Sequence, residues 1–149
     1  MTASVPSPLL QQALAHQRAG RPDRAAALCA QILAVAPDNF DALHLAGALD
    51  LQLGRPAEAV ISLERARILR PGAVAVLARL GAALMALGRL AEAEVHARQA
   101  LHLDHRSADA HQVLGGVLMR SGRVEEAWQC YQALTTVRPR EAAGWVALG

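Results

Sequence analysis

The sequence contains no lysine, and only 3% of its 149 residues are aromatic. Its basic side chains are all arginines, spread along the chain, and the formal net charge is +2. This composition gives no basic footprint for nucleic acid or an acidic membrane, so neither is expected as a partner. With so few aromatics the core must be built from Ala and Leu, which suits close-packed helices better than sheets.

Long apolar runs are also missing. The longest, Leu80 to Gly88, is bracketed by Arg79 and Arg89 and is far shorter than the ~20 residues that span a bilayer. The first six residues have no basic or apolar region typical of a signal peptide. If the chain starts at its native methionine, we expect a cytoplasmic protein.

A four-fold repeat is what the sequence does have. A Gly-Arg pair recurs every 34 residues, at Gly20, Gly54, Gly88 and Gly122. An alanine follows five residues after each glycine. A fixed period of this length indicates stacked repeats, and it points to binding along an extended surface and away from catalysis.

Each period is predicted to form two helices. Its glycine ends the first helix, because a left-handed residue commonly closes a helix. Pro22 and Pro56 lie where the second helix begins, and Pro37 and Pro71 lie where it ends. The expected helices are 7–19, 23–35, 40–53, 57–69, 74–87, 91–103, 108–121 and 125–137, with a ninth from about 142.

These repeats resemble the tetratricopeptide repeat, a 34-residue helix-turn-helix unit. The third repeat carries Leu77, Leu80, Gly81, Leu84, Ala93 and Ala100 at the family's positions. The resemblance implies an all-α fold, a right-handed superhelical solenoid of antiparallel helix pairs. We expect one domain, 1–149, with repeats at 6–39, 40–73, 74–107 and 108–141 and a partial fifth at 142–149, which matches the motif at Trp145-Val146-Ala147-Leu148-Gly149. Departures from the pattern are His16, Asp50, Ala97 and His111.

The resemblance also implies that the first helices line a concave groove that binds a partner protein or peptide. The residues mapped to this groove are Leu10, Leu14, Gln17, Arg18, His44, Ala48, Leu51, Gln52, Ala75, Ala78, Arg79, Ala82, Met85, Gln112, Gly116, Met119 and Arg120. They make a largely apolar surface, for which we expect an apolar or amphipathic helix or an extended peptide. The alternative for each apolar residue is that it completes the core.

No pattern of catalytic, nucleotide-binding or metal-binding residues stands out, so we expect neither an enzyme nor a cofactor. His102, Asp104, His105 and His111 lie close in sequence, and a zinc site would need three or four converging ligands. Solvated histidines near the end of a helix are the favoured interpretation, and no metal site is predicted. Cys29 and Cys130 lie three repeats apart, beyond disulfide reach, and are expected to pack as small hydrophobes.

Two local questions stay open. Asp50 occupies a partly buried place in the family, where a lone carboxylate is costly. It either pairs with Arg79 on the adjacent helix or turns to solvent, and the second is slightly favoured. The helix expected from about 142 ends in mid-motif. Either the chain is a fragment of a longer protein, which we favour, or its uncapped end associates with another copy.

Two functions from different classes are consistent with these repeats. The first is a non-catalytic scaffold for protein–protein interaction. The second is a substrate-recruiting region at the front of a larger enzyme. The segments 30–34 and 42–45 are similar to the first repeats of bacterial proteins that carry a glycosyltransferase or sulfotransferase domain.

Overall fold

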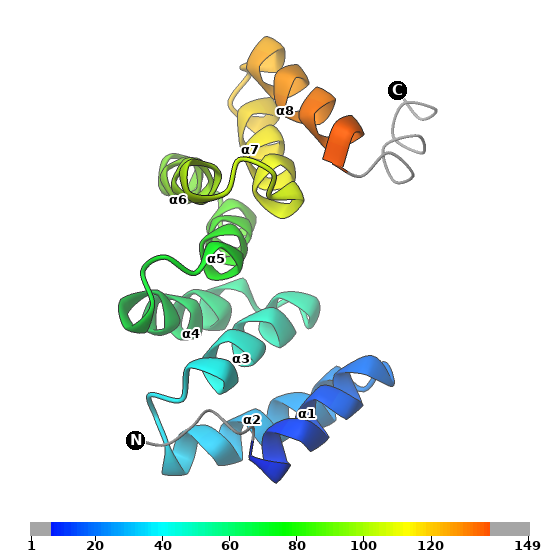
Figure 1. Cartoon of the computed structure of the whole chain (residues 1–149), viewed down its shortest axis with the longest axis vertical. Coiled ribbons are helices and arrows are strands. Elements are labelled where there is room, and N and C mark those ends of the chain that lie inside the picture. The colour runs from blue at the N-terminus through cyan, green and yellow to red at the C-terminus, as the bar shows by residue number, and fades with distance from the viewer. Residues whose placement is uncertain (1–6, 138–149) are drawn as a thin grey trace. The chain divides into compact units, whose positions relative to one another are not determined.

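The computed structural model describes residues 7–137, and this part of the chain is helical with short turns (Figure 1). The predicted all-α class is confirmed, and each observed helix begins and ends within one residue of its expected bounds. The ninth expected helix lies outside the described residues. The helices are α1 (Pro8–Arg18), α2 (Pro22–Val35), α3 (Phe40–Gln52), α4 (Pro56–Leu69), α5 (Val74–Ala86), α6 (Leu90–Leu103), α7 (Ala108–Arg120) and α8 (Val124–Val137).

Local sequence signals set the helix ends. Asn39 and Ser107 cap α3 and α7, their side chains accepting from the backbone N–H three residues on at 3.0 and 3.2 Å. Pro22 and Pro56 are the first residues of α2 and α4, where a missing N–H costs nothing. The repeated glycines have positive φ, +72° at Gly20 and +78° at Gly122, which reverses the chain between paired helices.

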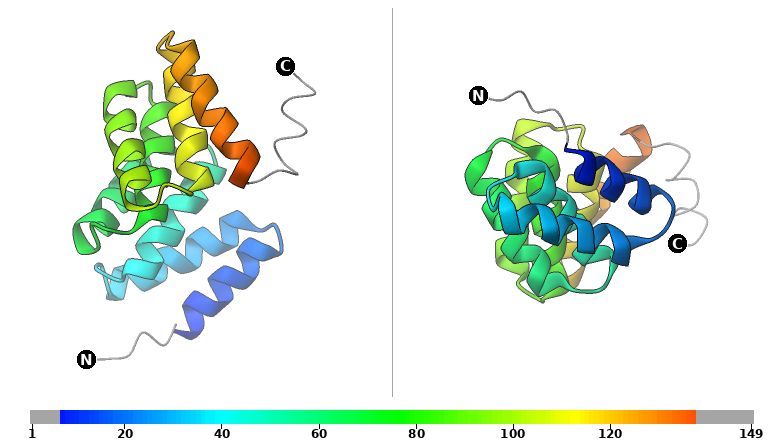
Figure 2. Two further views of the ribbon diagram at one scale, coloured as in Figure 1. Left: turned by 45° about the horizontal axis from the view of Figure 1, so that its top comes forward. Right: turned by 90° about the horizontal axis from the view of Figure 1, so that it is seen from below.

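The chain divides into two compact units, Met1–Pro71 and Gly72–Gly149. The first contains α1 to α4 and the second contains α5 to α8. Within each unit, the two helices of a repeat run antiparallel and pack closely together, as Figure 1 and Figure 2 show. Each unit therefore holds two complete helix pairs.

Small residues set how closely paired helices approach. A Cβ atom at Gly47 would lie 2.5 Å from Leu63 Cγ, and one at Gly115 would lie 2.8 Å from the Tyr131 ring. A large side chain of the second helix thus covers each glycine of the first. In the third repeat the covering position holds Ala97, and a Cβ at Gly81 would instead meet Val113 of α7 at 3.1 Å.

The cores are apolar, and no polar or charged residue among those described is buried. Cys29 and Cys130 are free, buried thiols, as expected from the sequence. Burial, reinforced by the charge of Asp50, raises the pKa of Cys29 to about 11, so this thiol is unreactive at neutral pH. Of the described helices, none is long and apolar enough to span a bilayer.

Candidate functional site

The residues mapped to the groove fall into three classes of exposure. Those that are half-buried are Leu14, Gln17, His44, Ala48, Leu51, Arg79, Ala82, Met85 and Gly116. Those that are exposed are Arg18, Gln52, Ala75, Gln112, Met119 and Arg120. Those that are buried are Leu10 and Ala78.

Leu10 and Ala78 correct the sequence prediction. Leu10 is 4% exposed in a cluster with Cys29 and Ile32, inside the first unit. Ala78 is 1% exposed and packs with Ala100 and Ala110 inside the second. Both complete a core, the alternative that the sequence left open, because neighbouring helices cover these turns of α1 and α5. A partner cannot contact them in this structure.

In the second unit, α5 and α7 pack directly against each other, and we call their half-buried or exposed residues Ala82, Met85, Gly116 and Met119 the α5–α7 face. A Cβ at Gly116 would lie 3.0 Å from Met85 Sδ, so the glycine is what lets this methionine lie across α7. Arg120 donates a hydrogen bond to the backbone carbonyl of Met85 and ties the ends of the two helices together. Met119, one turn after Gly116 on α7, is 46% exposed.

In the first unit the corresponding helices are less closely joined, because α1 and α3 make only marginal contact. His44 packs against Phe40, with ring centroids 5.9 Å apart. The guanidinium of Arg70 lies 4.0 Å from the centroid of the same Phe40 ring. The Phe40 ring is thus in contact with both His44 and the Arg70 guanidinium.

Asp50 has a partner that was not predicted. Its carboxylate lies 3.1 Å from Arg55 on the turn that follows α3, and its side chain is only 16% exposed. The expectation that Asp50 turns to solvent is therefore wrong. Burial raises the pKa of Asp50, and the nearby Arg55 only partly offsets this effect.

This raised pKa makes a pH-dependent prediction. Because the folded state binds the Asp50 proton more tightly than the unfolded state, the ionised carboxylate destabilises the fold at neutral pH. That penalty disappears as pH falls toward 3.8, the ordinary pKa of the group. Asp50→Asn should therefore be at least as stable as wild type at neutral pH, and this advantage should shrink on acidification.

Denaturant melts at several pH values, with Asp38→Asn as the matched control at an exposed ion pair, measure this difference. The prediction would be contradicted if the free energy of unfolding of Asp50→Asn were lower than that of wild type and the difference grew toward neutral pH.

The histidines next to α7 do not converge. His111 Nε2 donates to the backbone carbonyl of His105 at 2.8 Å, which turns its ring along the preceding loop. Within residues 7–137, no three His, Cys, Asp or Glu side chains are grouped so that they could hold a metal ion.

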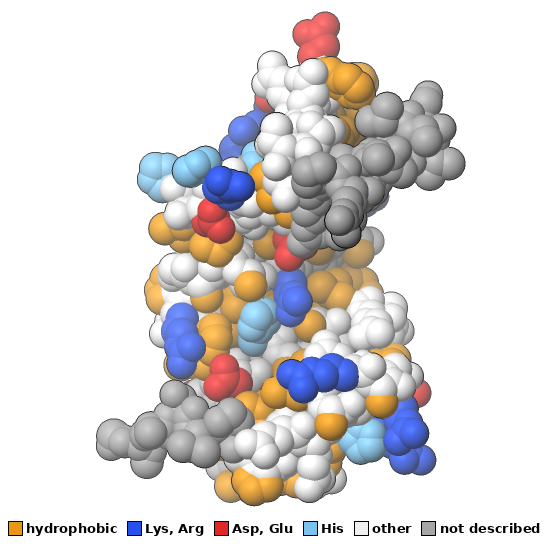
Figure 3. All heavy atoms as spheres, turned by 45° about the vertical axis from the view of Figure 1, so that its right-hand side comes forward, with side chains coloured by type: hydrophobic (Ala, Val, Ile, Leu, Met, Phe, Trp, Pro, Cys, Tyr) orange, Lys and Arg blue, Asp and Glu red, His pale blue; other side chains and the backbone are white. Residues whose placement is uncertain are grey.

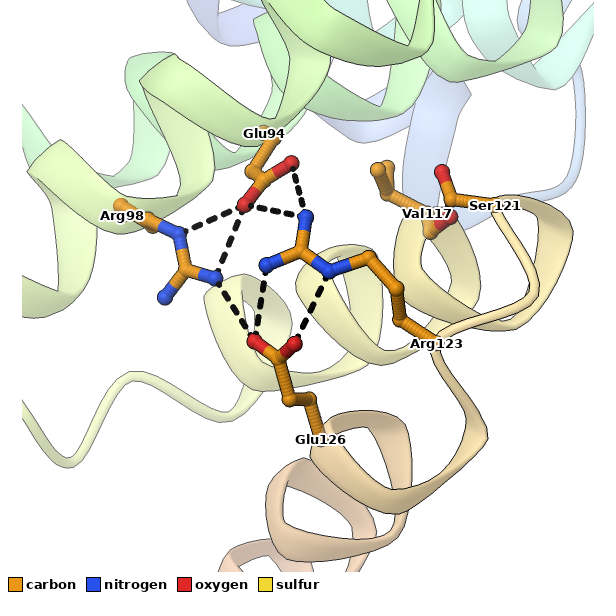
Figure 4. A network of polar contacts seen from close by, with 6 residues as sticks. All are labelled: Glu94, Arg98, Val117, Ser121, Arg123 and Glu126. Carbon is orange, nitrogen blue, oxygen red and sulfur yellow. Dashed lines mark hydrogen bonds and ion pairs between the residues drawn. The ribbon is translucent and has the colours of Figure 1, made fainter.

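An ion-pair network between α6 and α8 was not predicted (Figure 4). Arg123 bonds to Glu94 at 2.9 Å and to Glu126 at 2.8 Å, and Arg98 lies 2.8 Å from Glu94 and 3.4 Å from Glu126. The hydrogen bond from Arg123 is the main cause of the lowered pKa of Glu126. Because Glu94 and Arg123 stand 29 positions apart, only a comparison between repeats could have suggested this contact.

Large apolar side chains are exposed mainly on the second helix of each pair. Those that lie there are Val35, Ile61, Ile68, Leu69, Val95, Leu103, Val124 and Trp128. In the space-filling view, hydrophobic side chains emerge among polar ones (Figure 3). They are spread over α2, α4, α6 and α8 and do not by themselves define a site.

Solved structures of proteins named MamA are similar to this chain. The one from Desulfovibrio magneticus RS-1 has a TM-score of 0.81 and 23% identity, over 89% of this chain and 75% of that chain. MamA AMB-1 has a TM-score of 0.77 and 29% identity, over 87% of this chain and 76% of that chain. MamA MSR-1 has a TM-score of 0.76 and 28% identity, over 89% of this chain and 76% of that chain. These similarities confirm the predicted solenoid fold class.

Models of a protein family match this sequence, whereas no curated protein matches it. One model described as "Tetratricopeptide repeat" matches residues 10–74 and 44–110, and a second with the same description matches 84–148. The similarity to glycosyltransferase and sulfotransferase proteins is unconfirmed. Together, the matched segments extend over most of the sequence, and the chain belongs to the tetratricopeptide-repeat family.

Proposed function

We propose that this protein is a non-catalytic scaffold whose α5–α7 face binds an apolar or amphipathic segment of a partner protein. Its family and its similarity to MamA structures support a protein-interaction scaffold in general. The particular surface is our proposal.

The observation that supports this proposal is which residues make up the α5–α7 face. Met85 lies over Gly116, and together with half-buried Ala82 and exposed Met119 it makes an apolar strip along the two helices. Methionine is unbranched and polarizable, so it adapts to differently shaped apolar partners. An amphipathic helix that lays its apolar side on such a strip would bury these residues together.

Charge at the end of this strip gives a partner its orientation. Arg120 is exposed and its guanidinium caps the carbonyl end of α5 at Met85. The other donors of the guanidinium are open to an acidic or carbonyl group of a bound segment. The same surface would serve the alternative function, recruitment of substrate by a larger enzyme, so the two functions differ in whether a catalytic domain is attached to these repeats.

The test replaces Ala82 and Met119 by Glu in one variant. Two carboxylates on the strip should lower partner affinity about tenfold or more, because a bound apolar segment would desolvate them. Proteins from the source cell that bind the wild-type chain are identified by mass spectrometry, and affinity is then measured for each purified candidate.

Val95→Glu is the matched control, since Val95 is 63% exposed on α6, away from the proposed strip. The proposal requires a partner that binds wild type and Val95→Glu with equal affinity and binds the Ala82→Glu/Met119→Glu variant much more weakly. A partner that binds all three chains equally would refute it.

A further inference from the structure

We infer that the turn between α1 and α2 is a second interaction surface, which binds an acidic segment of a partner protein. The surface consists of Arg18, Arg21 and Arg24, which we call the basic turn. All three are exposed. It lies in the first unit, so it is separate from the α5–α7 face and goes beyond the function proposed above.

The basic turn is unusual because its arginines are unpaired. Within residues 7–137 most arginine side chains meet a carboxylate, a carbonyl oxygen or an aromatic ring. The arginine side chains in this range that have no such partner are Arg18, Arg21, Arg24 and Arg106. Although arginines are spread along the sequence, three of the four unpaired ones lie within residues 18–24, one at the end of α1, one in the turn and one in the first turn of α2.

The other repeats show what this turn lacks. In the third and fourth repeats, the arginine after the glycine pairs with a glutamate three residues later: Arg89 with Glu92 at 2.7 Å and Arg123 with Glu126 at 2.8 Å. In the first repeat the equivalent of that glutamate is Arg24, so the ion pair is replaced by two like charges. Figure 4 shows the pairing in the fourth repeat.

Backbone geometry does not explain the substitution. Arg21 and Arg55 begin their helices with the same dihedral angles, φ −119° and ψ 66°, and the glycines before them share φ +72°. Yet Arg55 pairs with Asp50, whereas Arg21 has no carboxylate. A cation in the first turn of a helix also opposes the helix dipole. Arg24 therefore does not serve the fold, and its charge is available to a ligand.

The chemistry of the basic turn favours carboxylates of a protein segment. Guanidinium groups bind carboxylates in bidentate pairs, and three of them match a short run of Asp or Glu. Single-stranded nucleic acid would need stacking aromatics, and Phe40, the aromatic residue of the first unit, lies against Arg70 instead. A membrane would need more cations or an apolar anchor, and no large hydrophobic residue is exposed within residues 7–24.

The test measures binding of a fluorescein-labelled oligoglutamate peptide to the whole chain by fluorescence anisotropy. The decisive variant is Arg24→Glu, which gives the first repeat the charge pattern of the other three. Since the introduced carboxylate can pair with Arg21 as Glu92 pairs with Arg89, we expect this variant to melt at the same temperature as wild type or higher. Its affinity for the peptide should fall about tenfold or more, since a cationic contact is lost and an anion gained.

Arg106→Glu is the matched control because it reverses another exposed, unpaired arginine in the second unit. It should bind the peptide as wild type does. The inference is overturned if wild type does not bind, if Arg24→Glu binds as tightly, or if Arg106→Glu loses as much affinity. It is also overturned if oligothymidylate DNA or phosphatidylserine vesicles bind more tightly than the peptide and depend equally on Arg24.

Discussion

Leu63→Ala is expected to lower the free energy of unfolding by about 2–5 kcal/mol. Leu63 is fully buried, and its side chain covers Gly47 of the paired helix. Removing it takes away apolar contacts and leaves a cavity that rigid helices cannot fully close. Chemical denaturation of the purified chain measures the loss.

Gly47→Ala tests the same contact from the other side. The new Cβ would lie 2.5 Å from Leu63 Cγ and 2.6 Å from Leu63 Cδ2, so the Leu63 side chain or a helix must shift. Overpacking of this kind costs about 1–3 kcal/mol, which exceeds the gain of about 1 kcal/mol in helix propensity. The single variant should be destabilised.

The double variant, Gly47→Ala with Leu63→Ala, is the sharper experiment. The alanine methyl at position 47 enters the space that Leu63 leaves, so the double variant should lose less stability than the two single losses together. We expect a coupling of about 1 kcal/mol or more. Additive losses would mean that Leu63 does not set the distance between α3 and α4.

Gly88→Val is expected to cost about 2 kcal/mol. Gly88 has φ +77°, and an L-residue with a side chain pays roughly 1–2 kcal/mol in this region, more when it is β-branched. No atom lies within 4 Å of a Cβ placed there, so the loss would come from the backbone alone. Thermal and chemical melts measure it.

Gly72→Val is the matched control, because Gly72 has no positive φ and its Cβ would also meet open space. It should change stability by no more than about 0.5 kcal/mol. Equal losses at the two glycines would contradict the assigned role of the repeated glycine as the left-handed residue of each turn.

The helices and turns were predictable because their signals are local. A glycine that must be left-handed and a proline in the first turn each act within a few residues, and both recur with the repeat. The all-α class and the helix ends follow from these signals. They are independent of how the repeats pack on one another.

The candidate site was less predictable. The resemblance to the family implied that Leu10 and Ala78 line the groove, but both lie in a core. Their burial depends on which turn of the helix a neighbouring helix covers, and the repeat pattern does not give this. Asp50 pairs across a turn with Arg55, where the outcome depends on side-chain geometry. The basic turn could have been found by aligning positions 24, 58, 92 and 126, whereas overall composition hides it.

Hydrogen exchange of the chain alone and with a purified partner tests the central claim most directly. If the α5–α7 face is the binding surface, amides in 74–86 and 108–120 should exchange more slowly in the complex, and those of α6 should be unchanged. Slower exchange confined to the second helices, 90–103 and 124–137, would contradict the account.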